Sequence, residues 1–338
     1  MEASPIPYEF QFKTDLILLP VYLAVIVPVS LVSAFGNSLV LAAVFRETRF
    51  SRPSYSIVAA LAFLDVCITV VAAAPAAIPS FIPSHVVCSL TVQYFLFFPR
   101  DVLATASFMT ILLMTAERYF SIVSPLRHRR IVTKRLVRHA LAAVWTFSLV
   151  PRLLFYHYDD DWVDIAVCAE LSLQQAVMMT VIGIVGVVLL ILMNVHTLVL
   201  LRRRLQMRAK QRVHITRKCV DSSRSSSVSD SSSSNAKANK AVAVVVFFFV
   251  ACWLPVICYC VIEAVSHYVE IDLETLHVLR VVLTLFLNLN GALRPVIYAR
   301  QHPYFLVAYW NILRRSRRVR ENEENIMSSS VSRKVRDR

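Results

Sequence analysis

Long runs without a charged side chain set the strongest limit on how this chain folds. Residues 16–45, 171–201 and 241–262 contain no Asp, Glu, Lys or Arg, and residues 53–99 contain only Asp65. About 20 helical residues cross a bilayer core, so each run is long enough for at least one crossing. The sequence therefore predicts an all-α membrane protein whose helices satisfy their own backbone hydrogen bonds in lipid.

The number of spans follows from where these runs turn. Residues 53–99 suit two helices, with turn signals at Pro79 and Pro83 between them. A content of 57% hydrophobic and 17% charged residues also differs from that of soluble proteins. The fourth span is the weakest, because Arg152 interrupts its uncharged stretch. We predict seven spans, near residues 18–45, 54–78, 91–122, 136–157, 173–201, 239–263 and 276–299.

Charge on the connecting segments separates the two sides of the membrane. One set of connections carries 30 Lys and Arg against 7 Asp and Glu, a sum of +23, and the other carries 3 against 12, a sum of −9. Because positive loops stay in the cytoplasm, the amino terminus is predicted outside and the carboxyl terminus inside. The positive set comprises 46–52, 127–138, 202–240 and 300–338; the negative set comprises 1–15, 152–170 and 263–280.

Six charged side chains remain inside the predicted spans, and their charges cancel, because +23 and −9 already give the net +14 of the chain. Ionisable residues within a membrane are functional candidates and tend to pair. The six form three candidate pairs: Asp65 with Arg294, Arg100 with Asp101, and Glu117 with Arg118. The alternative is coincidence, with Arg100 and Asp101 near the outer interface.

Arg294 has two possible environments. It pairs with Asp65 in the bundle interior, or its guanidinium snorkels to the inner interface, since Arg300 lies six residues further, about 9 Å along a helix. We predict the pair, because a carboxylate beside an arginine stays ionised.

The stretch MTAERYFSIVSPLRHRR at 114–130 is similar to the end of the third helix and the second cytoplasmic loop of rhodopsin-like (class A) G protein-coupled receptors. Other motifs that resemble those of this family occur in the same order along the chain. HPYFLVAYWNILRR suits an amphipathic eighth helix along the inner leaflet. Further landmarks are GNSLV with Asn37, LAFLD with Asp65, Trp145 in the fourth span, FFFVACWLP with Phe249, Trp253 and Pro255, and RPVIY ending at Tyr298.

The resemblance implies a seven-helix bundle at the plasma membrane that converts binding of an extracellular ligand into nucleotide exchange on a heterotrimeric G protein. It implies neither an enzyme nor a cofactor or metal. The predicted parts are an extracellular amino terminus (1–17), the bundle (18–299) with a basic, Ser-rich third cytoplasmic loop (about 202–238), and helix 8 with the tail (300–338).

Functional roles at the cytoplasmic end are also implied by the family. Arg118 meets the G protein when the sixth helix swings outward, and a pair with Glu117 holds it away before then. Some members have an acidic latch on the sixth helix where this chain has Asn235 and Lys237, so basal activity is expected. The implied coupling residues are Glu117, Arg118, Tyr119, Pro125, Leu126 and Tyr298.

The family implies a polar core and a switch between the two ends. Relatives bind sodium through residues matching Asp65, Ser107 and Arg294, most of them with Asn or Asp at the last position, so here a guanidinium would take the place of the cation. Pro255 is a plausible hinge, and Trp253 either senses the outer cavity or packs ordinarily. The network is Asn37, Asp65, Ser107, Asn290 and Arg294; the switch is Phe249, Trp253 and Pro255.

Ligand identity stays open at this level. Arg100 occupies the third-helix position at which amine receptors carry an aspartate, which disfavours a monoamine unless a local bulge at Pro99 restores the aspartate Asp101 to that position. Asn288 occupies the position of the lysine that holds retinal, which rules out attachment of retinal there through a Schiff base. Acidic outer loops could attract a basic ligand or merely be solvated, whereas Arg100, Arg152 and Arg280 could bind a carboxylate. The pocket candidates are Arg100, Asp101, Trp253, Tyr259, Arg280 and Asn288.

Outer cysteines and inner serines complete the implied sites. Similarity to the family implies a disulfide between Cys88 and Cys168, although Cys88 lies 30 residues before Arg118, more than is usual. Residues 202–212 should continue the fifth helix and meet anionic lipid. Residues 221–235 are a flexible linker or a site where phosphates recruit arrestin after a receptor kinase acts. Phosphorylation candidates are Ser227, Ser328, Ser329 and Ser330.

Other functions have less support. The sequence has no GxxxxGK, HExxH or GxSxG motif, and its basic residues flank spans, which disfavours an enzyme and a nucleic-acid binder. A transporter would explain charges in the membrane, but no internal repeat is seen. A receptor-like protein without G protein signalling is the closer alternative, because Arg294 and a missing fifth-helix proline alter the activation machinery.

Overall fold

The computed structural model describes residues 20, 22–77, 98–156, 173–218, 251–262, 264–265, 268–269, 273–301 and 304–315. Throughout these ranges the regular secondary structure is helical, as the apolar runs predict.

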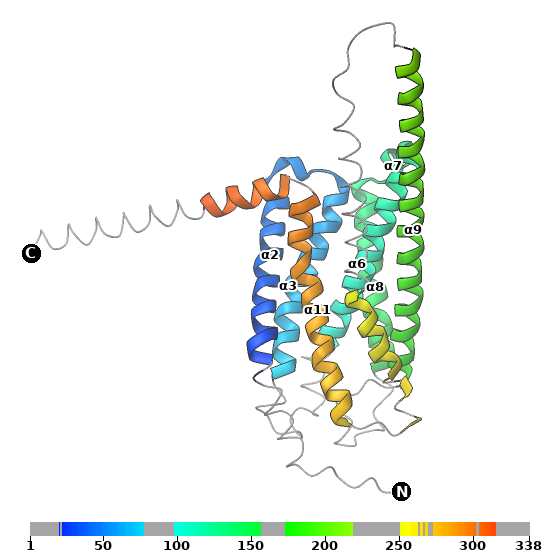
Figure 1. The fold of residues 1–338 in the computed structure, drawn as a ribbon. Coiled ribbons are helices and arrows are strands. Elements are labelled where there is room, and N and C mark those ends of the chain that lie inside the picture. The colour runs from blue at the N-terminus through cyan, green and yellow to red at the C-terminus, as the bar shows by residue number, and fades with distance from the viewer. Residues whose placement is uncertain are drawn as a thin grey trace, which may run out of the picture.

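Long helices stand side by side and form the bundle (Figure 1). Helix α6 packs against α3, α8 and α9, and α2 packs against α3 and α11. The described helices are η1 (Tyr22–Ile26), α2 (Val27–Arg46), η2 (Thr48–Phe50), α3 (Pro53–Ala77), α6 (Phe98–Val123), α7 (Pro125–Ile131), α8 (Lys134–Tyr156), α9 (Leu173–Lys218), α11 (Leu273–Gln301) and residues 251–262 and 304–315. We call the end that carries α7 and residues 304–315 the inner end, and the opposite end the outer end.

Three of these helices are long and apolar enough to cross a membrane. They cover Ala24–Arg46, Pro53–Val71 and Val177–Arg204, and Ala251–Ile262 is a shorter apolar helix. Helices α6, α8 and α11 each contain ionisable residues between their ends, which makes them less apolar. Helix α9 continues beyond the apolar part to Lys218, as predicted for residues 202–212.

The weakest predicted span forms one continuous helix. Helix α8 runs through Pro151 and Arg152 to Tyr156. Arg152 is 2% exposed, and its Nη1 lies 3.5 Å from Oδ2 of Asp101 on α6. A charged residue in a membrane helix is tolerated when it faces the bundle and pairs, so the ion pair explains why the helix does not end at Arg152.

Small residues bring α2 and α11 close together. A Cβ atom on Gly36 would lie 2.8 Å from Cγ of Pro295, and one on Gly291 would lie 2.8 Å from Oγ of Ser33. Both distances are shorter than real Cβ contacts, so larger side chains would push the helices apart. Close approach at small residues is a common basis of helix packing in membranes.

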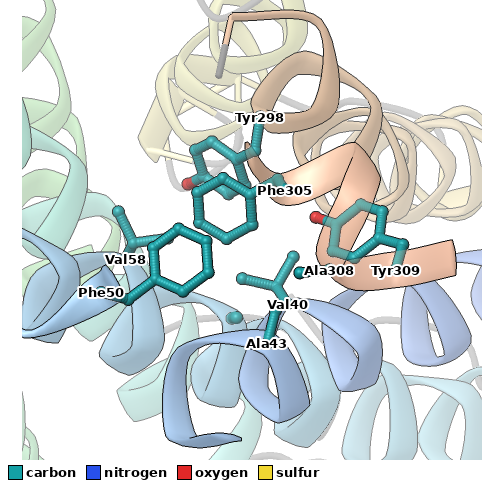
Figure 2. Close-up of a cluster of buried hydrophobic side chains, with 9 residues drawn as sticks. Val40, Ala43, Phe50, Val58, Tyr298, Phe305, Ala308 and Tyr309 are labelled. Carbon is teal, nitrogen blue, oxygen red and sulfur yellow. The ribbon is translucent and has the colours of Figure 1, made fainter. Parts of the chain in front are cut away.

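An apolar cluster anchors residues 304–315 to the inner end of the bundle (Figure 2). Phe305 is fully buried, and its ring centroid lies 4.5 Å from that of Phe50 and 5.8 Å from that of Tyr298. Burial also raises the pKa of Tyr309 in the same cluster. The opposite face of this helix exposes Trp310, as expected for an amphipathic helix on the inner leaflet.

The Phe305→Ala variant is expected to lower the free energy of unfolding by about 3–5 kcal/mol, because it leaves a cavity among buried rings. The measurement is thermal unfolding of purified protein in detergent. Trp310→Ala removes an aromatic ring that is 57% exposed and should cost far less. Equal losses in the two variants would contradict the docking of this helix.

Candidate functional site

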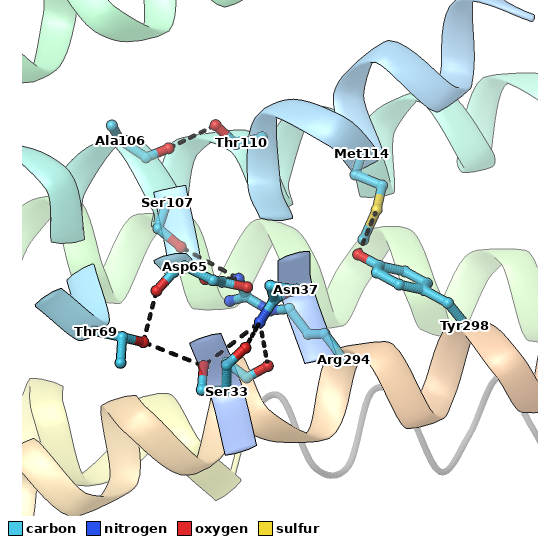
Figure 3. Close-up of polar contacts among 11 residues, drawn as sticks. Ser33, Asn37, Asp65, Thr69, Ala106, Ser107, Thr110, Met114, Arg294 and Tyr298 are labelled. Atoms are coloured by element: carbon cyan, nitrogen blue, oxygen red, sulfur yellow. Dashed lines mark hydrogen bonds and ion pairs between the residues drawn. The ribbon is translucent and has the colours of Figure 1, made fainter. Parts of the chain in front are cut away.

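An ion pair lies at the centre of the bundle (Figure 3). Nη1 of Arg294 on α11 is 2.5 Å from Oδ1 of Asp65 on α3, and the two side chains are 9% and 4% exposed. The same Nη1 lies 3.4 Å from Oγ of Ser107 on α6. Arg294 therefore lies inside the bundle. It pairs with Asp65 and does not snorkel to the inner interface.

A second set of contacts links this pair to Trp253. In the amide orientation that satisfies both neighbours, the Asn290 side-chain oxygen accepts hydrogen bonds from Nη2 of Arg294 at 2.9 Å and from Nε1 of Trp253 at 3.0 Å. Asn290, Trp253 and Arg294 are all buried. A chain of polar contacts thus runs from Trp253 through Asn290 and Arg294 to Asp65.

Polar residues of α2 extend the network by hydrogen bonds to α3 and α11. Asn37 Nδ2 donates to the carbonyl oxygen of Gly291 at 3.0 Å, so Asn37 meets α11. Thr69 Oγ1 lies 2.7 Å from the Asp65 carbonyl oxygen and 3.3 Å from Ser33 Oγ. Ser33 also lies 3.4 Å from Asn37 Nδ2, so it stands between Asn37 and the Asp65 helix.

Sequence reasoning missed Ser33 and Thr69, although a signal was present. Ser33 precedes Asn37 by four residues and Thr69 follows Asp65 by four, and residues four apart share one face of a helix.

A small cavity adjoins the ion pair. Its volume is about 20 Å³, which is room for one water molecule. Its lining includes Ser33, Asp65, Thr69, Trp253, Asn288 and Arg294. The site carries its own cation, because the guanidinium of Arg294 neutralises Asp65. In the part of the chain that is described, no three His, Cys, Asp or Glu residues are grouped so that they could hold a metal ion.

Aromatic packing couples Trp253 to α9. The ring centroids of Trp253 and Phe108 lie 4.4 Å apart. A Cβ atom on Gly186 would come within 2.4 Å of the Phe108 ring, so this ring lies directly against the α9 backbone. Trp253 and Pro255 belong to the helix 251–262, and Phe249 lies outside the described residues.

At the outer end, Asp101 contacts two arginines. Its Oδ1 is 3.0 Å from Nε of Arg100, and its Oδ2 is 3.5 Å from Nη1 of Arg152. Tyr259 and Asn288 are buried, and Asn288 Oδ1 lies 3.3 Å from Ser30 Oγ. Arg280 belongs to α11, but its side chain is outside the description.

At the inner end, the predicted pair of Glu117 with Arg118 is wrong. Glu117 Oε1 lies 2.7 Å from Nε2 of His128 and accepts a hydrogen bond from Ser54 at 2.6 Å. Among the described residues it forms no ion pair with Arg118. Consecutive helical residues point in directions about 100° apart, so Glu117 faces α3 and α7 instead.

The other predicted coupling residues lie around the same end. Tyr119 contacts Nδ1 of His196 on α9 at 2.9 Å, and Tyr298 OH lies 3.9 Å from the sulfur of Met114. Pro125 begins α7, where a proline fits the first helical position. Leu126 beside it is 85% exposed.

Several predicted sites lie outside the described residues. They are the disulfide Cys88 and Cys168, the latch positions Asn235 and Lys237, and the phosphorylation candidates Ser227, Ser328, Ser329 and Ser330.

Comparison with known proteins identifies the class that this bundle defines. The sequence model of the 7 transmembrane receptor (rhodopsin family) matches residues 36–298. This range exceeds half of the chain, and the chain belongs to the rhodopsin family of seven-transmembrane receptors. It is therefore a membrane protein built on a seven-helix bundle.

Individual relatives are more distant. The chain is 26% identical over 302 residues to cannabinoid receptor 1 of Xenopus laevis, which covers 84% of this chain and 62% of that receptor. It is 29% identical over 137 residues to olfactory receptor 6X1 of Homo sapiens, covering 39% and 42%. It is 31% identical over 157 residues to somatostatin receptor type 5 of Rattus norvegicus, covering 44% and 39%. The chain thus matches less than two thirds of the length of each.

Proposed function

We propose that the protein is a plasma-membrane receptor that converts binding of an extracellular ligand into guanine-nucleotide exchange on a heterotrimeric G protein. The observation that carries this proposal is the polar chain from Trp253 through Asn290 and Arg294 to Asp65. Family membership supports the same conclusion. A ligand above Trp253 would change the contacts of this chain, and α11 would carry the change toward the inner end.

The inner end suits a G protein. The charge pattern supports a cytoplasmic location, with the amino terminus outside. Leu126 offers an exposed apolar side chain next to three arginines of α7, and the basic extension of α9 adds further positive charge. Arrestin and a receptor kinase are proposed as later partners through the serines named above.

The test is nucleotide exchange on a panel of G proteins with the full-length receptor in lipid nanodiscs. Arg118→Ala is expected to reduce exchange at least about tenfold, because it removes a charged contact with the partner. Leu126→Ala should also reduce it, since it removes an exposed apolar anchor. Arg138→Ala changes an exposed arginine of α8 and serves as the matched control.

One result would favour the alternative. If the wild-type receptor produces no Arg118-dependent exchange on any G protein in the panel, the protein is a receptor-like member of the family that does not signal in this way. One observation favours this second candidate function, a receptor-like protein without G protein signalling. The buried guanidinium of Arg294 lies where the resemblance leads us to expect a mobile cation.

A further inference from the structure

The short helix α7 at the inner end lacks the usual sources of helix stability. It is seven residues long, no side chain caps its amino terminus, and none of its residues is buried. Helices this short are marginal in water without tertiary contacts. Its position must therefore depend on the few contacts that it makes with the bundle.

His128 makes a side-chain hydrogen bond from α7 to the bundle. Its Nε2 lies 2.7 Å from Oε1 of Glu117 on α6, and the two side chains are 18% and 11% exposed. Ser54 on α3 donates to the same oxygen at 2.6 Å, so the carboxylate is fixed from two sides. Partial burial makes such a contact stronger than one on an open surface.

The remaining charges near His128 are positive. Arg127, Arg129 and Arg130 lie on α7, Arg118 follows Glu117 on α6, and Arg204 on α9 donates to the Val123 carbonyl oxygen at 3.4 Å. Ser54 is the uncharged partner from α3. Among the described residues, Glu117 is the acidic side chain that contacts α7.

We propose that His128 is a positioning residue for coupling: its contact with Glu117 holds α7 in place, presents Leu126 to the G protein, and keeps the Glu117 carboxylate away from Arg118. The effect on coupling rests on the proposed function, whereas the contact between His128 and Glu117 does not.

The contact is tested without a G protein by measuring distances between spin labels on Ile131 of α7 and Met207 of α9, both exposed. Full-length wild type in nanodiscs should give one narrow distribution. His128→Leu and Glu117→Gln should each broaden it, the double variant should broaden it no further, and His128→Gln should preserve it because an amide still donates. His139→Leu, an exposed histidine of α8, is the control.

Coupling is tested separately by basal nucleotide exchange. His128→Leu should lower exchange about fivefold, the effect of one hydrogen bond of ordinary strength, and His128→Gln should restore most of it.

The two measurements separate the two failures. An unchanged distance distribution in His128→Leu would overturn the contact, whatever the G protein does. A broadened distribution with unchanged exchange would overturn the positioning role. Absence of exchange in wild type would refute the proposed function and this coupling role together, while the distance data would still decide whether His128 holds α7.

Discussion

Replacing Arg294 with asparagine is expected to make the stability of this receptor depend on sodium, whereas the wild type should respond equally to sodium and potassium. In the wild type a guanidinium 2.5 Å from Asp65 supplies the positive charge within the bundle. The variant would leave Asp65, Ser107 and an amide around the vacated space. These are the oxygen ligands that hard cations prefer.

The size of the effect follows from mass action. Sodium at ten times its dissociation constant would stabilise the folded variant by about 1.4 kcal/mol if it binds the folded state alone. The measurement is thermal unfolding in sodium chloride and in potassium chloride at equal ionic strength. Arg294→Asn combined with Asp65→Asn removes the carboxylate and should abolish the difference between the salts.

Two outcomes would count against this account. A sodium-dependent midpoint in the wild type would mean that Arg294 does not occupy the cation position. Sodium-independent unfolding of Arg294→Asn would mean that the vacated space does not bind the ion, even though the pair is correctly placed.

Much of the fold could be predicted because the bilayer imposes a simple rule. A run without charge, about 20 residues long, has few alternatives to a spanning helix, and the apolar helices Ala24–Arg46 and Val177–Arg204 obey this rule. The rule fails for α8, where Arg152 interrupts the uncharged run but pairs with Asp101 of another helix. Hydropathy sums local residues, so it cannot show a compensating charge that comes from elsewhere in the chain.

In the candidate site, too, the sequence predicts the partners of some residues and not of others. Asp65 and Arg294 were recognisable because isolated charges of opposite sign in apolar helices have few partners available. Glu117 lies near the end of a helix, where water, loops and neighbouring helices all offer partners. Its contact with His128 depends on how α7 folds back after Ser124, and no periodic pattern in the sequence encodes that turn.

The Asp65→Asn variant is expected to be much less stable than Arg294→Gln, although each breaks the same ion pair. An arginine cannot lose its charge in a protein, so Asp65→Asn leaves a buried cation without its counter-charge. Removing one partner of a buried pair in this way costs about 3–5 kcal/mol. After Arg294→Gln, by contrast, the carboxyl group can bind a proton and become neutral, which limits the loss.

The double variant Asp65→Asn with Arg294→Gln separates this explanation from simple loss of packing. Two neutral amides can hydrogen-bond to each other, so the double variant should be more stable than Asp65→Asn alone, with a coupling energy of about 1–3 kcal/mol. Thermal unfolding and the yield of monodisperse protein give the comparison. If Arg294 instead lay among lipid headgroups, Asp65→Asn would cost little and the two substitutions would be additive. A large, non-additive loss therefore requires the guanidinium to lie in the bundle interior, beside the carboxylate that it neutralises.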